Sequence, residues 1–370
     1  MRTAGLSSAV SRPFETARSQ RDRVCILAVL AILATSWITS SSASSADLMA
    51  VLAAALAYSE GATHLVYPGD QVVFGMMPPD EWSAMMRGAG YDGELYPYLY
   101  PPLWAALFSL CAQAIDVDWL VDVARVANHA LLLGSLWLAW RITGRVIPFF
   151  VFMAIGAAAT FLTLPGAVAL AENQPQILVG ALILLAIERS GAGAPRTAGA
   201  ALALAAALKG YPALLAVIWI GTREWRALAA FAAAGAALAM LSVMLAGWPL
   251  HAEFLRVLSV ISDTALATNF SFGLNPLLAQ IPPIYPNEIV MRPDLVNEAG
   301  EAAQYLAVVK TELWKSASLA LLIVSLLAVT FAMGRADHEV RYSTLWPFSI
   351  TIIALFLPLP WCYSCTGPQF

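Results

Sequence analysis

Long apolar segments separated by short polar ones run through the whole chain. A membrane-spanning helix needs roughly 20 apolar residues, and about eight to ten segments approach that length. The candidates are residues 24–40, 100–116, 124–141, 146–168, 174–188, 197–221, 227–247, 313–333 and 342–359. This pattern predicts an all-α polytopic membrane protein with about eight to ten transmembrane helices.

Two longer polar stretches, residues 41–99 and 248–312, interrupt the apolar pattern. We therefore expect a tail over 1–23, one multispanning domain over 24–362 and a short C-terminal end over 363–370. Residues 47–58 open the first loop with helical spacing of apolar side chains, and we expect this helix to lie in the membrane interface. Two large loops on one face predict a covered cavity there.

Composition narrows the class of protein. Of 370 residues, 60% are hydrophobic and only 12% are charged, whereas ordinary soluble domains are about 25% charged. The net charge of −4 is small and dispersed, which argues against a nucleic-acid partner. A Cys-x-x-Cys lies at 362–365, but no second pair or nearby histidine completes a metal site. We expect no cofactor; a need for a divalent metal stays open.

The arginines predict the orientation in the membrane. Five of them precede the first apolar segment, and positively charged flanks stay cytoplasmic. The N-terminus is therefore expected inside, with loop 41–99 outside, as in a multi-pass protein of a bacterial-type plasma membrane. That loop holds seven acidic residues and one basic residue, Arg87.

The alternation of inside and outside fails once. Arg141 and Arg145 should be cytoplasmic, yet two apolar segments, 100–116 and 124–141, separate them from the external loop. Either these arginines are external or one of the two segments is re-entrant.

The first apolar segment has an alternative interpretation. A basic start, an apolar run and small residues at 43–46 also form the pattern of a cleaved signal peptide. The length of the run and the many later spans favour an uncleaved helix.

Asp47 stands at the external end of the first apolar segment. Its position before an expected helix is typical of an N-cap. A carboxylate at a membrane–water boundary also suits a general base acting on a substrate that arrives from the lipid. The two roles are compatible, and the position taken alone favours an N-cap or a loop residue over a base.

Lys209, one of three lysines in the chain, lies inside an apolar run and is followed by Gly210 and Pro212. A cation near the membrane centre costs about 2.5–3.5 kcal/mol on insertion scales, so it should face a cavity or an anion. Broken helices mark binding sites in membrane proteins. We interpret Lys209 as an anion-binding residue, with a snorkelling lysine as the alternative.

Two polar or aromatic groups could contact a sugar or a lipid. Asn173, Gln174 and Gln176 lie in a polar turn between apolar segments, and amides both donate to and accept from hydroxyls. Tyr98 and Tyr100 lie in a Tyr-Leu-Tyr-Pro-Pro stretch, where they could stack on a sugar ring or belong to an interfacial aromatic belt.

Together, Asp47, the stretch at 98–102, the turn at 173–174 and the helix break at Lys209 resemble glycosyltransferase family 87. The resemblance runs in order from about residue 20 to 362. It implies a C-type membrane glycosyltransferase architecture related to polyprenyl-phosphate-mannose-dependent mannosyltransferases. It also implies a polyprenyl-phosphate sugar donor, an external active site and a catalytic aspartate in the first external loop, which Asp47 matches by position.

The chain departs from the family pattern in two places. The turn reads Asn-Gln-Pro-Gln over 173–176, where the family usually has a glutamine before an asparagine. Trp361 is followed by Cys-Tyr-Ser-Cys and not by a histidine. Family members often continue through further spans, which leaves a complete or a truncated C-terminus open.

These observations predict an inverting hexosyltransferase, with mannose as the first candidate sugar. It would act on a glycolipid or glycan acceptor at the outer face, among membrane lipids, with Asp47 as base and Lys209 beside the departing phosphate. The alternatives are a transporter or flippase of a lipid-linked or anionic solute, with its site at Lys209, and an inactive truncated family member.

Overall fold

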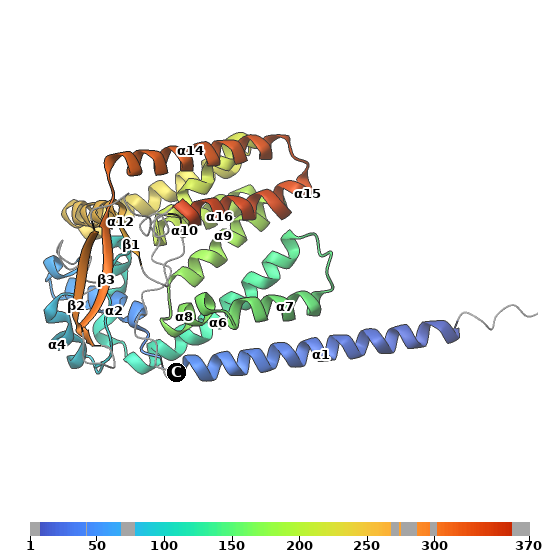
Figure 1. Cartoon of the computed structure of the whole chain (residues 1–370), viewed down its shortest axis with the longest axis horizontal. Coiled ribbons are helices and arrows are strands. Elements are labelled where there is room, and N and C mark those ends of the chain that lie inside the picture. The colour runs from blue at the N-terminus through green and yellow to red at the C-terminus, as the bar shows by residue number, and fades with distance from the viewer. Residues whose placement is uncertain are drawn as a thin grey trace, which may run out of the picture.

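The computed structural model describes residues 8–41, 43–67, 78–267, 274, 287–296 and 302–356. Helices dominate it and pack as a bundle, as predicted (Figure 1). The helices of the first half are α1 (Ser8–Ser40), α2 (Ala46–Ser59), α4 (Asp80–Gly88), α5 (Pro102–Phe108), α6 (Val117–Ile142), α7 (Phe149–Phe161) and α8 (Leu164–Ala171). Those of the second half are α9 (Gln176–Gly191), α10 (Pro195–Leu208), α11 (Val217–Gly221), α12 (Trp225–Asp263), α14 (Glu312–Arg335), α15 (His338–Val340) and α16 (Trp346–Phe356).

Full-length spans are fewer than the apolar segments. Among the described residues, three helices are long and apolar enough to cross a membrane: Arg18–Ser40, Trp225–Asp263 and Glu312–Arg335. Helices α7 and α8 form a fourth candidate if they act as one span, bent by 71°. Most other apolar segments are present as shorter helices, because prolines and polar turns divide them. Helix α6 is long enough, at 26 residues, but it is not among the helices apolar enough to count as candidate spans. The all-α polytopic class is confirmed.

The segment 100–116 is not a span. It folds as α5, which has seven residues and is about 10 Å long at 1.5 Å per residue, against a hydrocarbon core of about 30 Å. Pro102 opens α5, and after Phe108 the chain turns through a 3₁₀ helix at Ala112–Ala114. The sequence left two alternatives: external Arg141 and Arg145, or a segment that does not cross the membrane. The short α5 favours the second.

Helix α2 is enclosed by protein and does not lie with one face in the interface. Eleven of its fourteen residues are buried, and Ala46, Met49 and Ala53 have no exposed surface. They form a core with α4, α5, the start of α6 and the last part of α12. The expectation of an interfacial helix was wrong because alanine is small enough to be covered on every side, which apolar spacing alone does not reveal.

The second long loop is partly regular structure. Residues 248–263 continue α12 beyond a kink at Gly247, which has φ 73°, and Pro249. Three strands follow: β1 (Thr264–Ala267), β2 (Asn287–Val296) and β3 (Ala302–Val309). They form an antiparallel sheet in which β3 lies between β1 and β2. The predicted C-terminal end 363–370 and the Cys-x-x-Cys at 362–365 lie outside the described residues.

Short helices and strands lie together at one end of the bundle, and polar contacts join turns between longer helices at another place. Helices α2 and α4 and strands β2 and β3 gather at one end, on the left in Figure 1. Arginine-bearing turns meet elsewhere in the bundle, where Arg141 pairs with Glu188 at 2.7 Å and Tyr342 donates a hydrogen bond to Glu224 at 3.0 Å.

Helices α9, α10 and α12 pack closely and carry Lys209 at the end of α10. Gly199 makes the contact of α10 with α12 possible, because a Cβ there would lie 2.3 Å from the carbonyl oxygen of Ala227. A Cβ at Gly235, by contrast, would meet nothing within 4 Å.

We expect Gly199→Ala to lower the free energy of unfolding by about 1–3 kcal/mol, the range for overpacked contacts. Gly235→Ala is the matched control and should be neutral or stabilising, because alanine favours helix over glycine. Thermal unfolding of the purified protein in detergent measures both. Equal stability of the two variants would contradict this account of the α10–α12 contact.

Candidate active site

Glu172 holds the beginning of helix α2. The backbone N–H of Ala46 donates to the Glu172 carboxylate at 2.9 Å, and the N–H of Leu48 donates to the Glu172 carbonyl at 3.3 Å. The N–H of Asp47 also bonds the carboxylate. The first N–H groups of a helix have no partner within it, so a residue 126 positions away supplies the partner for three of them.

Asp47 is not the N-cap. That position belongs to Ser45, whose side chain makes no capping bond, and Asp47 is the second residue of the helix. The N-cap interpretation was wrong because Glu172 takes the role, a contact that local sequence does not contain. The Asp47 side chain is therefore available for other partners.

The partners of Asp47 are Lys209 and Gln174. Burial raises the pKa of the Asp47 carboxyl to about 6, while the charge of Lys209 and a hydrogen bond from Gln174 act in the opposite direction. A base with such a pKa is ionised at neutral pH and still able to accept a proton. Asp47 is half-buried, so part of the residue remains accessible at the surface of the protein.

Lys209 lies where α10 ends. The helix stops at Leu208, and Lys209 is extended, with φ −153° and ψ 113°. The break is supported from α5, where the Trp104 Nε1–H donates to the carbonyl of Ala207 at 2.8 Å. The Lys209 Nζ lies 5.9 Å from the centroid of the Tyr100 ring, within the range of a cation–π contact. The predicted helix break is confirmed.

A second carboxyl group adds to the charge of the site. Burial, together with the charges of Asp47 and Glu94, raises the pKa of Glu172 to about 7, although the bonds from the N–H groups of α2 act in the opposite direction. Asp47 and Glu172 thus form a pair of buried carboxyl groups with one lysine nearby.

The amides and tyrosines singled out in the sequence divide into two sets. Asn173 is buried with its amide oxygen bonded to Asn128 and its amide nitrogen to Ser45. Tyr98 has no exposed surface, donates to the Pro101 carbonyl and accepts from the Ala105 N–H.

Gln174 and Gln176, by contrast, are half-buried. Gln174 bonds Asp47, and the Gln176 Nε2 donates to the Tyr211 hydroxyl at 2.7 Å. Tyr100 is buried, with its ring toward Lys209. Substrate contact by any of the five residues stays a prediction; Gln174, Gln176 and Tyr100 are the three whose surroundings allow it.

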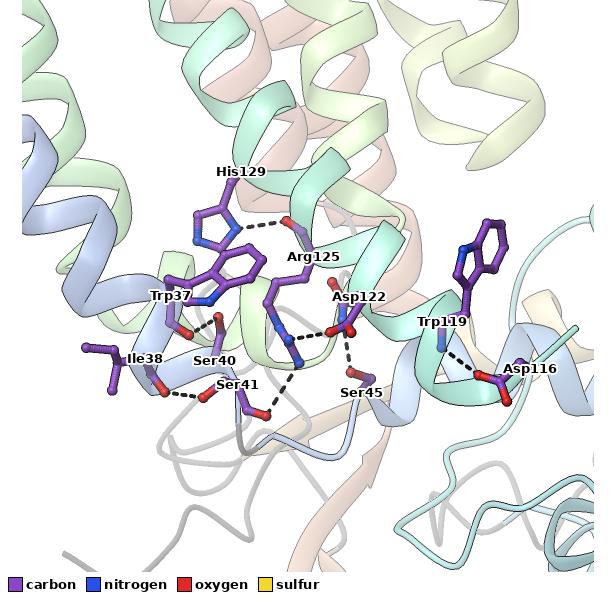
Figure 2. Close-up of polar contacts among 11 residues, drawn as sticks. Trp37, Ile38, Ser40, Ser41, Ser45, Asp116, Trp119, Asp122, Arg125 and His129 are labelled. Carbon is purple, nitrogen blue, oxygen red and sulfur yellow. Dashed lines mark hydrogen bonds and ion pairs between the residues drawn. The ribbon is translucent and has the colours of Figure 1, made fainter.

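Polar residues join α6 to the end of α1 beside this site (Figure 2). The buried Arg125 guanidinium contacts Asp122 at 2.7 Å and the Ser41 carbonyl at 3.4 Å, and it lies 5.4 Å from the Trp37 ring. A cation at the C-terminus of a helix is stabilised by the helix dipole. Arg125 therefore fixes the end of α1, from which the chain runs to Asp47.

Sequence reasoning missed Glu172, Ser45 and Asn128. Glu172 belongs to the same polar turn as Asn173, Gln174 and Gln176, whose amides gave the stronger signal for sugar binding. A glutamate enclosed by two apolar segments was the available signal. Asn128 gave a weaker one, as an amide within an apolar helix. Among the described residues, no group of three His, Cys, Asp or Glu could hold a metal ion.

The raised pKa of Glu172 predicts how stability changes with pH. The folded protein keeps a proton on Glu172 that the unfolded chain loses, so the free energy of unfolding should fall as pH rises from about 4.5 to about 7. Glu172→Gln keeps an oxygen for the N–H groups and removes the titration. Thermal midpoints at pH 5 and pH 7.5 should differ less in the variant than in the wild type. An equal or larger difference would contradict the assignment.

Comparison with known proteins places the chain in a family. The sequence profile of glycosyltransferase family 87 matches residues 98–358, more than half of the chain. The matched stretch contains Glu172 and Lys209 and begins after Asp47. No curated protein and no solved structure matches the chain. The chain therefore belongs to glycosyltransferase family 87 and is a membrane glycosyltransferase.

Proposed function

We propose that the protein transfers a hexose, with mannose as the first candidate, from a polyprenyl-phosphate donor to a hydroxyl of a glycolipid or glycan acceptor. The observation that carries the proposal is the juxtaposition of Asp47 and Lys209 at the break of α10, in a chain of a glycosyltransferase family. A base and a cation are the two groups that transfer from a phosphate-activated sugar requires.

Asp47 acts as the general base. It takes the proton of the acceptor hydroxyl while the acceptor oxygen bonds the anomeric carbon. The bond from that carbon to the phosphate oxygen breaks, and polyprenyl phosphate leaves with the electron pair. Because the phosphate is already a good leaving group, no covalent enzyme intermediate is needed, and the configuration at the anomeric carbon inverts.

Lys209 stabilises the charge that develops on the departing phosphate. Its half-buried position in an apolar surrounding makes the attraction stronger than it would be in water. Tyr100 beside it, and Gln174 and Gln176 on the neighbouring turn, are placed to contact the sugar. Tyr98 and Asn173 support the residues that do so.

The site faces the outside of a bacterial-type plasma membrane, and the N-terminus is cytoplasmic. The distribution of arginines supports this orientation. The short α5 supports it on the further proposal that α6 crosses, being 26 residues long although less apolar than the candidate spans. With α5 not crossing, Arg141 and Arg145 then lie on the side of the N-terminus.

Replacing Asp47 by Asn should lower transfer by about 10²–10⁴-fold, the usual contribution of a general base. Asp92→Asn is the matched control, because Asp92 belongs to the same loop with its side chain 85% exposed. The assay supplies labelled polyprenyl-phosphate mannose to membranes and identifies the product by mass spectrometry. Wild-type transfer by Asp47→Asn would exclude this base, and movement of unchanged donor without a new glycosidic bond would favour a transporter.

The pKa of Asp47 predicts the pH dependence of transfer. The base must be ionised, so kcat/KM should fall as pH drops through about 6 and not near 4. Gln174→Ala removes a hydrogen bond that lowers this pKa, so the acidic limb should move to higher pH. A pH profile of the purified enzyme measures both; a limb unchanged in Gln174→Ala would argue against Asp47 as the titrating group.

A further inference from the structure

Two residues with left-handed backbone contact each other beside Asp47. Four non-glycine residues of the described chain have positive φ: Ser45, Arg145, Asn173 and Arg223. Ser45 has φ 56° and Asn173 has φ 48°, and the Asn173 amide nitrogen donates to the Ser45 hydroxyl at 2.9 Å. Asparagine tolerates this conformation, and Asn173 uses it in the turn that ends α8, where the Gln174 N–H donates to the Ala169 carbonyl at 2.9 Å. For serine the conformation is disfavoured and persists where surrounding contacts hold it.

A third residue completes a chain of buried side chains. The Asn128 amide nitrogen donates to the amide oxygen of Asn173 at 2.9 Å. The exposed fractions are 8% for Asn128, 4% for Asn173 and 1% for Ser45. The chain links three segments distant in sequence: α6, the turn after α8, and the start of α2. In Figure 2, Ser45 lies just before α2, and the dashed line at its side chain marks the hydrogen bond from Asn173.

We propose that Asn128, Asn173 and Ser45 form a clamp that positions the Asp47 carboxylate, which rests on the proposed role of Asp47 as base. Ser45 is the N-cap of α2, so its backbone sets the direction in which α2 leaves, with Asp47 two residues later. Asn173 lies between Glu172, which binds the N–H groups of α2, and Gln174, which bonds the Asp47 side chain. The clamp therefore positions both the backbone of α2 at Asp47, through Glu172, and the Asp47 side chain, through Gln174.

The amide of Asn173 is oriented by its two partners. Asn128 donates and so selects the Asn173 oxygen, which leaves the Asn173 nitrogen directed at the Ser45 hydroxyl. Serine at residue 45 accepts this bond while in a conformation that glycine would adopt more easily. The clamp is a positioning device, since all three of its members are buried and their side chains bond one another.

Glycine substitutions separate the side chains from the backbone. Because glycine adopts positive φ without strain, Ser45→Gly and Asn173→Gly remove the bond between the two residues and keep both turns possible. Each variant should lower kcat by about 10- to 100-fold, the loss expected when a reacting group is displaced by about 1 Å. KM for labelled polyprenyl-phosphate mannose should stay within about twofold, a difference that one bond to a sugar hydroxyl would exceed.

The double variant Ser45→Gly/Asn173→Gly should be no slower than the slower single variant, because both changes remove the same hydrogen bond. The matched control is Ser36→Ala, which removes another buried contact between α1 and α6, to His129 at 3.2 Å, and should keep wild-type kcat. Wild-type kcat in either glycine variant, losses that multiply in the double variant, or an effect on KM alone would overturn the clamp.

Hydrogen exchange tests the clamp without reference to activity. The N–H groups of residues 46–48 should exchange faster in Asn173→Gly than in the wild type or in Ser36→Ala. Unchanged exchange overturns the clamp whatever the enzyme does. Full transfer by Asp47→Asn with faster exchange in Asn173→Gly would overturn the proposed base instead, so the two failures are distinguishable.

Discussion

The first turn of α2 depends on Glu172 for its hydrogen bonds. Its N–H groups lie in a buried part of the protein, where an unpaired backbone group costs free energy. A carboxylate accepts these bonds and is itself stabilised by the positive end of the helix. Since α2 carries Asp47 and lies at the centre of one core of the bundle, its placement depends on this contact between residues distant in the sequence.

The same contact creates the electrostatics of the site. Bringing Glu172 to the start of α2 also brings it near Asp47, whose charge disfavours the ionised form of Glu172. Lys209 and Gln174 lower the pKa of the Asp47 carboxyl against the effect of its burial. The Asp47 carboxyl is thereby kept nearer to ionisation than that of Glu172, as the proposed roles of Asp47 as base and Glu172 as acceptor for the α2 N–H groups require.

The sequence allowed the helical membrane class and the break after Lys209 to be predicted, because each leaves a local signal of hydropathy or proline. The catalytic role of Asp47 stays a prediction. The burial of α2 and the shortness of α5 could not be predicted in this way. Apolar spacing does not distinguish lipid from protein as the surrounding of a helix, and the Pro101–Pro102 entry could begin either a span or a single turn. The capping of α2 by Glu172 depends on tertiary contact alone.

The sheet illustrates the same limit. Residues 264–309 contain few runs with a strict strand period, and their strands are defined by pairing with one another. Asn173 illustrates it for the site: an amide in a polar turn is equally suited to a sugar or to a neighbouring side chain. The positions of Asn128 and Ser45 show that the Asn173 amide bonds neighbouring side chains.

The most direct test is a structure of the protein with a non-transferable phosphonate analogue of a polyprenyl-phosphate sugar. The account predicts a phosphonate oxygen within about 3 Å of the Lys209 Nζ, with the Asp47 carboxylate facing the side of the anomeric carbon away from the phosphonate. A phosphonate bound away from Lys209, or an anomeric carbon that Asp47 cannot reach even through an acceptor hydroxyl, would contradict it.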